Sequence, residues 1–439
     1  MTLPRRASAA STFLLLAALA GAARANPFEL FGYTPRAVGM GGSMTALGDD
    51  LAGAFYNPAG MLGHTKSEFG MGFADTIQNL HVNRTTSSTI GNADPGGSDP
   101  RFELGLIFPL GGQILKDRVA LGVAFGHPVG SLVKVQTVDQ AHPQFYMYQS
   151  KPQRFALSMG IGIKIINGLS IGGGAQVLAQ QIGKVNFQLD VASRRFVARD
   201  ITVDLNTVPT PVAGILIEPN DSIKIGFSWR KESELYYEQP TNLDLGDLGA
   251  LNLNVHGIAQ YWPHVFSLGV AVKPTSRLLV SVQADYLLWH KAPRDQVFVS
   301  VSAGGGVIGG LGLSDLLGFQ AADAAPNFSD VLVPHLGVEY GVNDVLTLRI
   351  GGGVRPAVTP DQSGTTNYLD NFTETISGGL SVRFNDPLKV FTDPVTFDIG
   401  ASVMIANERT NQKQSADPTG GASYGGQLFT LAAMLRYLY

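Results

Sequence analysis

Charged side chains that could bind an anion recur on the polar faces of segments whose apolar residues alternate along the chain. A guanidinium or ammonium group beneath an apolar pocket could hold a carboxylate, and arginine can do so through two parallel hydrogen bonds. The same groups could instead form ordinary ion pairs inside the fold, and the sequence leaves both interpretations open. The cations are Arg118, Arg154, Lys164, Lys224, Arg349 and Arg383, and the carboxylates are Asp285, Glu339 and Asp398.

A long apolar segment between Lys291 and Val333 is a second candidate for ligand binding. Exposed apolar surface of this extent usually marks a binding site. The segment could therefore receive an apolar molecule first, with Ser314–Gln320 as a short helix, or it could fold back on itself as a packed lid. The residues that we assign to ligand contact here are Leu316, Leu317 and Phe319.

Other patterns that often carry chemistry are weak in this chain. Gly304-x-Gly306-x-x-Gly309 has the spacing of a dinucleotide-binding loop, but no crossover helix with an acidic partner follows it. The eight histidines include no HExxH motif and cysteine is absent, so we expect neither a metal nor a cofactor. A Ser-His-carboxylate set assembled by folding would make the protein a lipid-acting enzyme, and this alternative stays open.

The segments that carry these residues alternate apolar and polar side chains with a period of two. Such alternation is the signature of a strand, and helical spacing would scramble it. A face of small and polar residues suits the interior of a barrel whose other face meets lipid. The pattern is clearest in Arg154–Ile165, Arg277–Trp289 and Pro394–Ile405.

Along the whole chain, this alternation predicts an all-β fold of about fourteen antiparallel strands closed into a transmembrane β-barrel. Short turns alternate with long segments, as in a barrel inserted from the periplasm with its long loops outside. The expected strand centres are Met71, Leu106, Val123, Gly160, Ala175, Gly214, Gly226, Gly269, Gln283, Gly337, Arg349, Gly379, Gly400 and Ala433. The expected long loops are residues 74–101, 127–153, 191–199, 239–254, 291–333, 356–373 and 407–426.

Composition and the last strand also favour a membrane barrel. Charged residues make up 15% of the chain, below the roughly 25% of soluble domains. The final strand ends on Tyr439 with Tyr437 on the same face, which resembles the terminal strands read by the outer-membrane assembly machinery. A formal net charge of −4 gives no reason to propose nucleic acid as a partner.

The first residues are typical of a signal peptide. Arg5 and Arg6 precede a short apolar stretch, and Ala23-Arg24-Ala25 gives the small-x-small pattern of a cleavage site. We therefore expect an exported protein in three parts. These are a signal peptide over residues 1–25, a segment of different character over residues 26–65, and the transmembrane barrel over residues 66–439.

Residues 26–65 are punctuated by glycines and by a turn at Asn57-Pro58, and they show no alternation. Glycine lets backbones approach where side chains would clash, so this segment can pack compactly. A barrel of about fourteen strands is wider than one that side chains alone can fill. We therefore expect the segment to plug the lumen as an N-terminal hatch.

The hatch carries a recognisable pattern. Pro35-Arg36-Ala37-x-Gly39-Met40-Gly41-Gly42, then Asp49-Asp50 and Asn57-Pro58-Ala59, resembles the start of the FadL/TodX family of outer-membrane long-chain fatty acid and hydrocarbon transport proteins. The stretches Gly337-x-Glu339-Tyr340 and Leu348-Arg349-x-Gly351 are similar to later parts of that family. The hatch-motif residues by this resemblance are Gly39, Gly41, Gly42, Asp49, Asp50, Asn57, Pro58 and Ala59.

This resemblance implies a channel in the outer membrane of a Gram-negative bacterium for passive uptake of hydrophobic compounds, long-chain fatty acids above all, gated by the hatch. It also makes Arg349 the preferred anchor for a ligand carboxylate, with Arg154 as a further candidate. Gly126 and Pro128 end the third strand and could mark a lateral gap for ligand exit, because proline cannot donate to the strand ladder. They could equally begin an external loop.

The partners that we expect are hydrophobic small molecules (fatty acids or hydrocarbons), outer-membrane lipids and, during insertion, the barrel assembly machinery. Nothing in the sequence requires more than one chain, so we expect a monomer. Two alternatives remain beside the channel: a shuttle or assembly partner of the same fold, and the lipid-acting enzyme. The choice of substrate is not encoded in any motif.

Overall fold

The computed structural model describes residues 31–63, 66–84, 96–111, 115, 117–129, 133–134, 143–148, 153–154, 156–190, 195–244, 250–293, 297–304, 327–364, 366–386, 393–413 and 420–439. The expected signal peptide lies outside these residues. In the described ranges, no helix has both the length and the apolar character needed to cross a membrane.

Fourteen antiparallel strands pair in a closed ring, and we call them the wall strands. Pairing of the last strand with the first closes the barrel. In order around the ring they are β1 (Glu68–Arg84), β3 (Arg101–Pro109), β4 (Val119–Pro128), β8 (Ala156–Ile166), β9 (Leu169–Asp190), β10 (Arg195–Asn220), β11 (Ile223–Arg230), β14 (Val265–Thr275), β15 (Leu278–Leu287), β17 (Val331–Gly341), β18 (Leu346–Arg355), β20 (Thr373–Phe384), β21 (Val395–Asn411) and β22 (Ala422–Leu438).

The predicted wall is confirmed, because each of the fourteen expected strand centres lies in a different wall strand. The apolar face of the alternation points outward, as expected for a surface that meets lipid. Ile376, Leu431 and Leu332 are 63%, 59% and 54% exposed on neighbouring or nearby strands. The residues beside them in sequence point inward, and Ser377, Thr430 and Val333 are buried.

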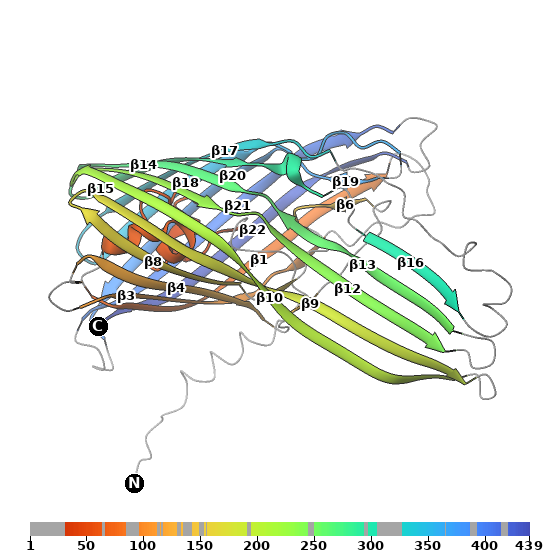
Figure 1. Cartoon of the computed structure of the whole chain (residues 1–439). Helices are drawn as coiled ribbons and strands as arrows, with labels where there is room; N and C mark the ends of the chain where they lie inside the picture. Colours follow the sequence, from red (N-terminus) through yellow and green to blue (C-terminus); the bar gives the residue numbers. More distant parts are fainter. Residues whose placement is uncertain are drawn as a thin grey trace, which may run out of the picture.

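Several expected long loops are wrong in extent because strand pairing continues beyond the lipid-facing residues. β9 and β10 pair as far as residues 190 and 195. A further hairpin of β12 (Ser233–Asp244) and β13 (Ala250–Trp262) occupies the expected loop over 239–254, and β16 (Val297–Gly304) pairs with β13. Figure 1 shows these strands extending past one end of the barrel. Apolar alternation locates a strand only where one face meets lipid, whereas backbone hydrogen bonding needs no lipid.

Five very short strands complete the described sheet structure. β2 (Gly96–Ser98) pairs with β1. β5 (Val133–Lys134) pairs with β7 (Gln153–Arg154), and β6 (Gln144–Phe145) pairs in parallel with β19 (Tyr368–Leu369). The β6–β19 pair brings residues 143–148 into the external end of the lumen, where Phe145, Met147 and Tyr148 are buried.

Residues 31–63, which we call the hatch segment, fold as short helical pieces in place of strands. They form α3 (Pro35–Gly39), α4 (Gly53–Tyr56) and the 3-10 helix η2 (Pro58–Gly63), while a second 3-10 turn, η4 (Trp289–Lys291), follows β15. Pro35 stands in the first turn of α3, where its missing N–H is not needed, and the Thr34 hydroxyl accepts from Ala37 N. In Figure 1 the coiled hatch segment lies inside the barrel near the end that holds the C-terminus.

Candidate functional site

The wall strands contact the hatch segment closely through the backbone of their glycines. Glycines of the wall strands form a ring that we call the glycine belt, and a Cβ at any of them would meet hatch atoms. At Gly172, for example, it would lie 2.3 Å from Ala59 N, and at Gly226 only 2.1 Å from Thr45 O. The belt consists of Gly70, Gly105, Gly122, Gly160, Gly162, Gly172, Gly214, Gly226, Gly269, Gly337, Gly351, Gly379 and Gly400.

This belt explains why so many inward positions are glycine. It includes every wall strand except β15 and β22. β15 reaches the hatch segment through Ser281, whose Oγ lies 2.9 Å from Ser43 Oγ, and β22 through contacts with α3. The hatch segment therefore contacts strands around the whole circumference, and the glycines let its backbone and buried side chains approach the wall closely.

The Asn57-Pro58-Ala59 motif contacts four glycines of the belt, Gly160, Gly162, Gly172 and Gly214. Pro58 packs against Gly160, and the Asn57 side chain lies against Gly214. The Asn57 amide donates to Thr45 O at 2.7 Å and to Ile215 O of β10 at 3.2 Å, while its oxygen accepts from Ala59 N at 3.1 Å. The motif thus joins two parts of the hatch segment to each other and to the wall.

A chain of ion pairs holds the hatch segment on the side of the short turns. Arg36 bonds to Asp49 at 2.8 Å, to Asp50 at 3.1 Å and to Glu339 of β17 at 3.0 Å. Lys224 of β11 lies 3.7 Å from Asp49. Burial alone would raise the pKa of the Asp49 carboxyl, but Arg36 and Lys224 outweigh burial and hold this pKa well below its usual range.

Arg349, the preferred anchor for a ligand carboxylate, lies within this ion-pair chain. Its guanidinium bonds to Glu339 at 2.6 Å and to Asp398 at 3.2 Å, and Asp398 also pairs with Arg436 of β22. Arg349 does not line the cavity described below. Its role toward a ligand stays a prediction, and the contacts shown are those of an interior ion pair.

The remaining predicted site residues lie elsewhere. Arg154 stands in β7, paired with Val133 of β5, and its side chain lies outside the described part of the protein. Gly126 and Pro128 close β4: the pairing with β8 ends at Gly126, while pairing with β3 continues to Pro128. The assignment of a lateral gap there is not tested. Leu316, Leu317 and Phe319 fall outside the described residues.

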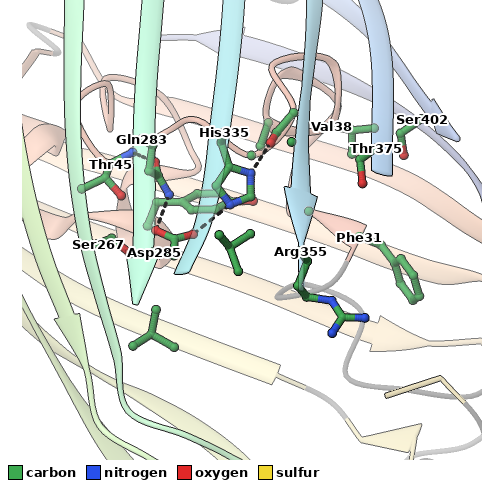
Figure 2. A pocket seen from close by; sticks show the side chains of 18 of the residues that line it. Phe31, Val38, Thr45, Ser267, Gln283, Asp285, His335, Arg355, Thr375 and Ser402 are labelled. Carbon is green, nitrogen blue, oxygen red and sulfur yellow. Dashed lines mark hydrogen bonds and ion pairs between the residues drawn. The ribbon is translucent and has the colours of Figure 1, made fainter. Parts of the chain in front are cut away.

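A cavity of about 140 Å³ lies on the external side of the hatch segment. Hatch residues such as Phe31, Val38 and Thr45 form one side of it, and residues of β11, β13, β14, β15, β17, β18 and β20 to β22 form the rest. Figure 2 shows the labelled side chains around this space. Its apolar lining includes Leu287, Val333 and Met404.

Aromatic rings pack at the external end of the lumen and form what we call the aromatic cap. Tyr146 stands at its centre, with ring centroids of Trp289, Phe328 and Tyr368 at 5.9, 4.7 and 5.6 Å. Trp262 of the cap also lines the cavity. The cap consists of Phe31, Phe145, Tyr146, Tyr148, Tyr261, Trp262, Trp289, Phe328, Tyr368 and Tyr424.

A polar group interrupts the apolar lining where the cavity meets the hatch segment. His335 of β17 and Asp285 of β15 pair at 3.1 Å, and Gln283 donates to Asp285 at 2.8 Å. His335 and Gln283 bond directly to hatch residues 41–45 and Asp285 links the two, as the dashed lines in Figure 2 show. Gln283 and Asp285 were on the predicted polar face, but that face alone does not give their height relative to the hatch.

The inward residues of β17 show the order of the aromatic cap, the cavity, the glycine belt and the ion pairs along the lumen. From the external end, Val331 belongs to the apolar cluster of the cap, Val333 and His335 line the cavity, Gly337 belongs to the belt and Glu339 to the ion pairs. Across the described ranges, no group of three or more His, Cys, Asp or Glu is placed to hold a metal ion.

Comparison with known proteins agrees with this architecture. The chain is 21% identical to the alkane uptake protein A of Marinobacter nauticus over 409 residues, covering 86% of this chain and 83% of that protein. Its fold is similar to a Pseudomonas aeruginosa FadL homologue (TM-score 0.57, 16% identity, 92% and 97% coverage). It is also similar to the toluene transporter TodX of P. putida (TM-score 0.57, 14% identity, 93% and 99% coverage).

A family model for outer membrane transport proteins of the OMPP1/FadL/TodX type matches residues 16–436, nearly the whole chain. The fourteen-stranded wall, predicted from alternation alone, has the architecture of the solved relatives. The protein therefore belongs to the FadL/TodX family of outer-membrane transport proteins and is a β-barrel of the Gram-negative outer membrane.

Proposed function

We propose that this protein is a channel for passive uptake of hydrophobic compounds, in which the compound occupies the cavity and the hatch segment gates its onward passage. The observation that carries the proposal is the cavity itself, which lies between the hatch segment and the aromatic cap and is lined by Phe31, Val38, Leu287 and Val333. Transfer of an apolar molecule from water to such a lining gains roughly 25 cal/mol per Å² of buried surface. No chemical step is needed for this function.

Long-chain fatty acids and neutral hydrocarbons both fit the apolar lining, and the charges beside it favour the hydrocarbons. Long-chain fatty acids, the class predicted from the sequence, would bring a carboxylate. Arg355 at the cavity already holds Asp370 through two hydrogen bonds of 2.7 and 2.8 Å, and His335 holds Asp285. A fatty acid would add a carboxylate beside Arg355 and His335, which already hold carboxylates, and this is costly in a buried site. Neutral long-chain hydrocarbons avoid this cost and are the second candidate.

The name of the alkane uptake relative points the same way. Uptake of labelled hexadecane and of labelled palmitate by a host strain that lacks its own channel separates the two classes. Hydrocarbon transport predicts uptake of hexadecane above the empty-vector level. Palmitate uptake alone would restore the fatty-acid assignment, and no uptake of either compound would contradict the proposed channel.

Gating by the hatch segment can be tested with a reversible lock. The chain has no cysteine, and Ser43 Oγ lies 2.9 Å from Ser281 Oγ, so Ser43→Cys with Ser281→Cys places two thiols within reach of a disulfide. Oxidation should tie the hatch segment to β15 and stop uptake, and reduction should restore it. The two single cysteine variants are the controls. Equal uptake in the oxidised and reduced double variant would contradict gating.

The enzyme alternative finds no comparable geometry at the cavity. A hydrolytic triad needs a histidine nitrogen facing a nucleophilic hydroxyl while the other nitrogen faces a carboxylate. In the His335–Asp285 pair, the second ring nitrogen lies 2.8 Å from the carbonyl oxygen of Gly41. The proposal therefore assigns this pair to the hatch segment and not to catalysis.

A further inference from the structure

We propose that His335, Asp285 and Gln283 form a latch that holds hatch residues 41–45 closed, and that an apolar ligand opens the latch by entering the cavity. This inference rests on the proposed gating and names the contacts that control it. The latch residues are adjacent in space because β15 and β17 are neighbouring wall strands, with Gln283 as the register partner of His335. All three line the cavity in which the ligand would lie.

His335 is held between two acceptors. Its Nδ1 lies 2.8 Å from the carbonyl oxygen of Gly41, and its Nε2 lies 3.1 Å from a carboxylate oxygen of Asp285. A carbonyl oxygen and a carboxylate can only accept, so both ring nitrogens must carry a proton for both bonds to form. The closed hatch therefore favours the imidazolium form of His335, and loss of a proton breaks one of the two bonds.

Gln283 provides the second attachment. Its side-chain oxygen accepts from the consecutive backbone amides of Met44 and Thr45, each at 2.8 Å, and its nitrogen donates to Asp285. A continuous hydrogen-bonded path thus runs from Gly41 through His335, Asp285 and Gln283 to Met44 and Thr45. The path brackets hatch residues 41–45 at both ends.

The loop held by the latch is packed more tightly on its wall side than on its cavity side. On the wall side it is tightly packed, because a Cβ on Gly41 would lie 2.3 Å from the backbone nitrogen of Gly352. On the cavity side, a Cβ on Gly42 would meet only His335, at 3.4 Å. Displacement of His335 would therefore open space for Gly42 on the cavity side, while Ser43 and Thr45 keep their hydrogen bonds to Ser281 and Asn57.

An apolar ligand competes with these bonds because it occupies the same space without offering donors or acceptors. A ligand shifts a conformational equilibrium only if it binds the two states with different affinity. When His335 and Gln283 rotate away from residues 41–45, their side chains contact the ligand. The ligand therefore binds the open state more tightly than the closed state. The groups that the latch uses to close the hatch segment are then the groups that detect the ligand.

Hydrogen–deuterium exchange of the backbone amides of residues 41–45 measures the latch directly in the full-length protein in detergent. Gln283→Met removes the side-chain acceptor of the Met44 and Thr45 amides, of which Met44 N also donates to Gly42 O at 2.9 Å, and keeps the His335–Asp285 pair. We expect exchange to rise about tenfold, the size of effect expected for lost buried hydrogen bonds. The double variant His335→Leu with Asp285→Asn removes the other attachment without leaving a lone carboxylate, and the same rise is expected.

Thr375→Val is the matched control, because Thr375 lines the same cavity from β20 without a hydrogen bond to residues 41–45 in the part of the chain that is described. Its exchange should equal that of the unaltered protein. Hexadecane should raise exchange of residues 41–45 in the unaltered protein and add little in the latch variants. Equal exchange in Gln283→Met, the double variant and Thr375→Val would overturn the latch.

Protonation of His335 gives an independent readout of the latch. After correction for intrinsic base catalysis, exchange at residues 41–45 should rise as the pH increases through the titration of His335, and the double variant should lose this rise. Asp285 faces His335 directly, and Arg230, Arg355 and Tyr56 are the other charged or titratable side chains lining the cavity. A profile that is identical in both proteins would contradict the imidazolium bridge.

The disulfide lock separates this inference from the proposed function. If oxidised Ser43→Cys/Ser281→Cys still transports, gating by the hatch segment is wrong whatever the latch variants do. If the lock stops transport but the latch variants exchange like Thr375→Val, gating stands and only the latch is wrong.

Discussion

The hatch segment meets the barrel in two contrasting ways on its two sides. Toward the short turns it is held by ion pairs centred on Arg36, and around its girth by backbone contact with the glycine belt. Toward the cavity, residues 41–45 are held by His335, which bonds to Gly41 O, and by Gln283, which accepts from Met44 and Thr45 N. The first kind of contact is dense and costly to break, and the second depends on a few side chains. This difference indicates that the hatch segment stays fixed at Arg36 and the glycine belt and moves at residues 41–45.

The largest expected effect comes from filling the glycine belt. A valine at Gly172 would place its Cβ 2.3 Å from Ala59 N, so the hatch segment must leave its seat or the barrel must fail to assemble. Gly173 is the matched control, because the nearest atom to its Cβ, Val212 O, lies 3.9 Å away. Trypsin should cut at Arg36 in folded Gly172→Val and spare Gly173→Val. Equal protection in both variants would show that the belt does not hold the hatch segment.

A smaller effect should follow from removing the buried cation. Arg36→Met leaves Asp49, Asp50 and Glu339 without the guanidinium they share, and breaking a buried pair typically costs about 3–5 kcal/mol. Lys66→Met breaks the exposed pair with Asp393, which should cost about 0–1 kcal/mol. Opening free energies of residues 31–40, measured by hydrogen exchange, give both values. Similar losses in the two variants would contradict a central role for Arg36.

The smallest effect is a pH dependence that distinguishes the two sides. Because the closed state holds the pKa of Asp49 below its usual range, Asp49 stabilises closure at neutral pH. That stability is lost as the pH falls below the ordinary carboxyl value of about 4. Exchange of residues 31–40 should therefore rise in acid, whereas the latch weakens as the pH rises. Asp49→Asn should lack the acid-dependent rise; if it retains that rise, the assignment to Asp49 is wrong.

How much of this could be predicted differs between the wall and the site. Alternation located the wall because lipid demands apolar side chains on every outward position, such as Val282 and Leu336. It failed for β12, β13 and β16, since pairing continued beyond the lipid-facing part of the barrel. The face of Gln283 and Asp285 was correct for the same reason as the wall.

The cavity could not be predicted from the sequence because its lining depends on where the hatch segment lies along the lumen. Nothing local to His335 distinguishes it from other inward residues until Gly41 is placed 2.8 Å away. Arg349 shows the opposite case. It is the register partner of Glu339 across the short turn between β17 and β18, so that turn would have predicted the ion pair.

The central claim, that a hydrophobic compound passes through the cavity above the hatch segment, is tested most directly by filling that cavity. Val333 lines it, while the preceding residue, Leu332, is 54% exposed on the outer face of the same strand. Uptake of labelled hexadecane should fall at least about tenfold in Val333→Trp, an effect of the size seen when a buried contact is lost, and stay unchanged in Leu332→Trp. Undiminished uptake in a correctly assembled Val333→Trp barrel would contradict the claim.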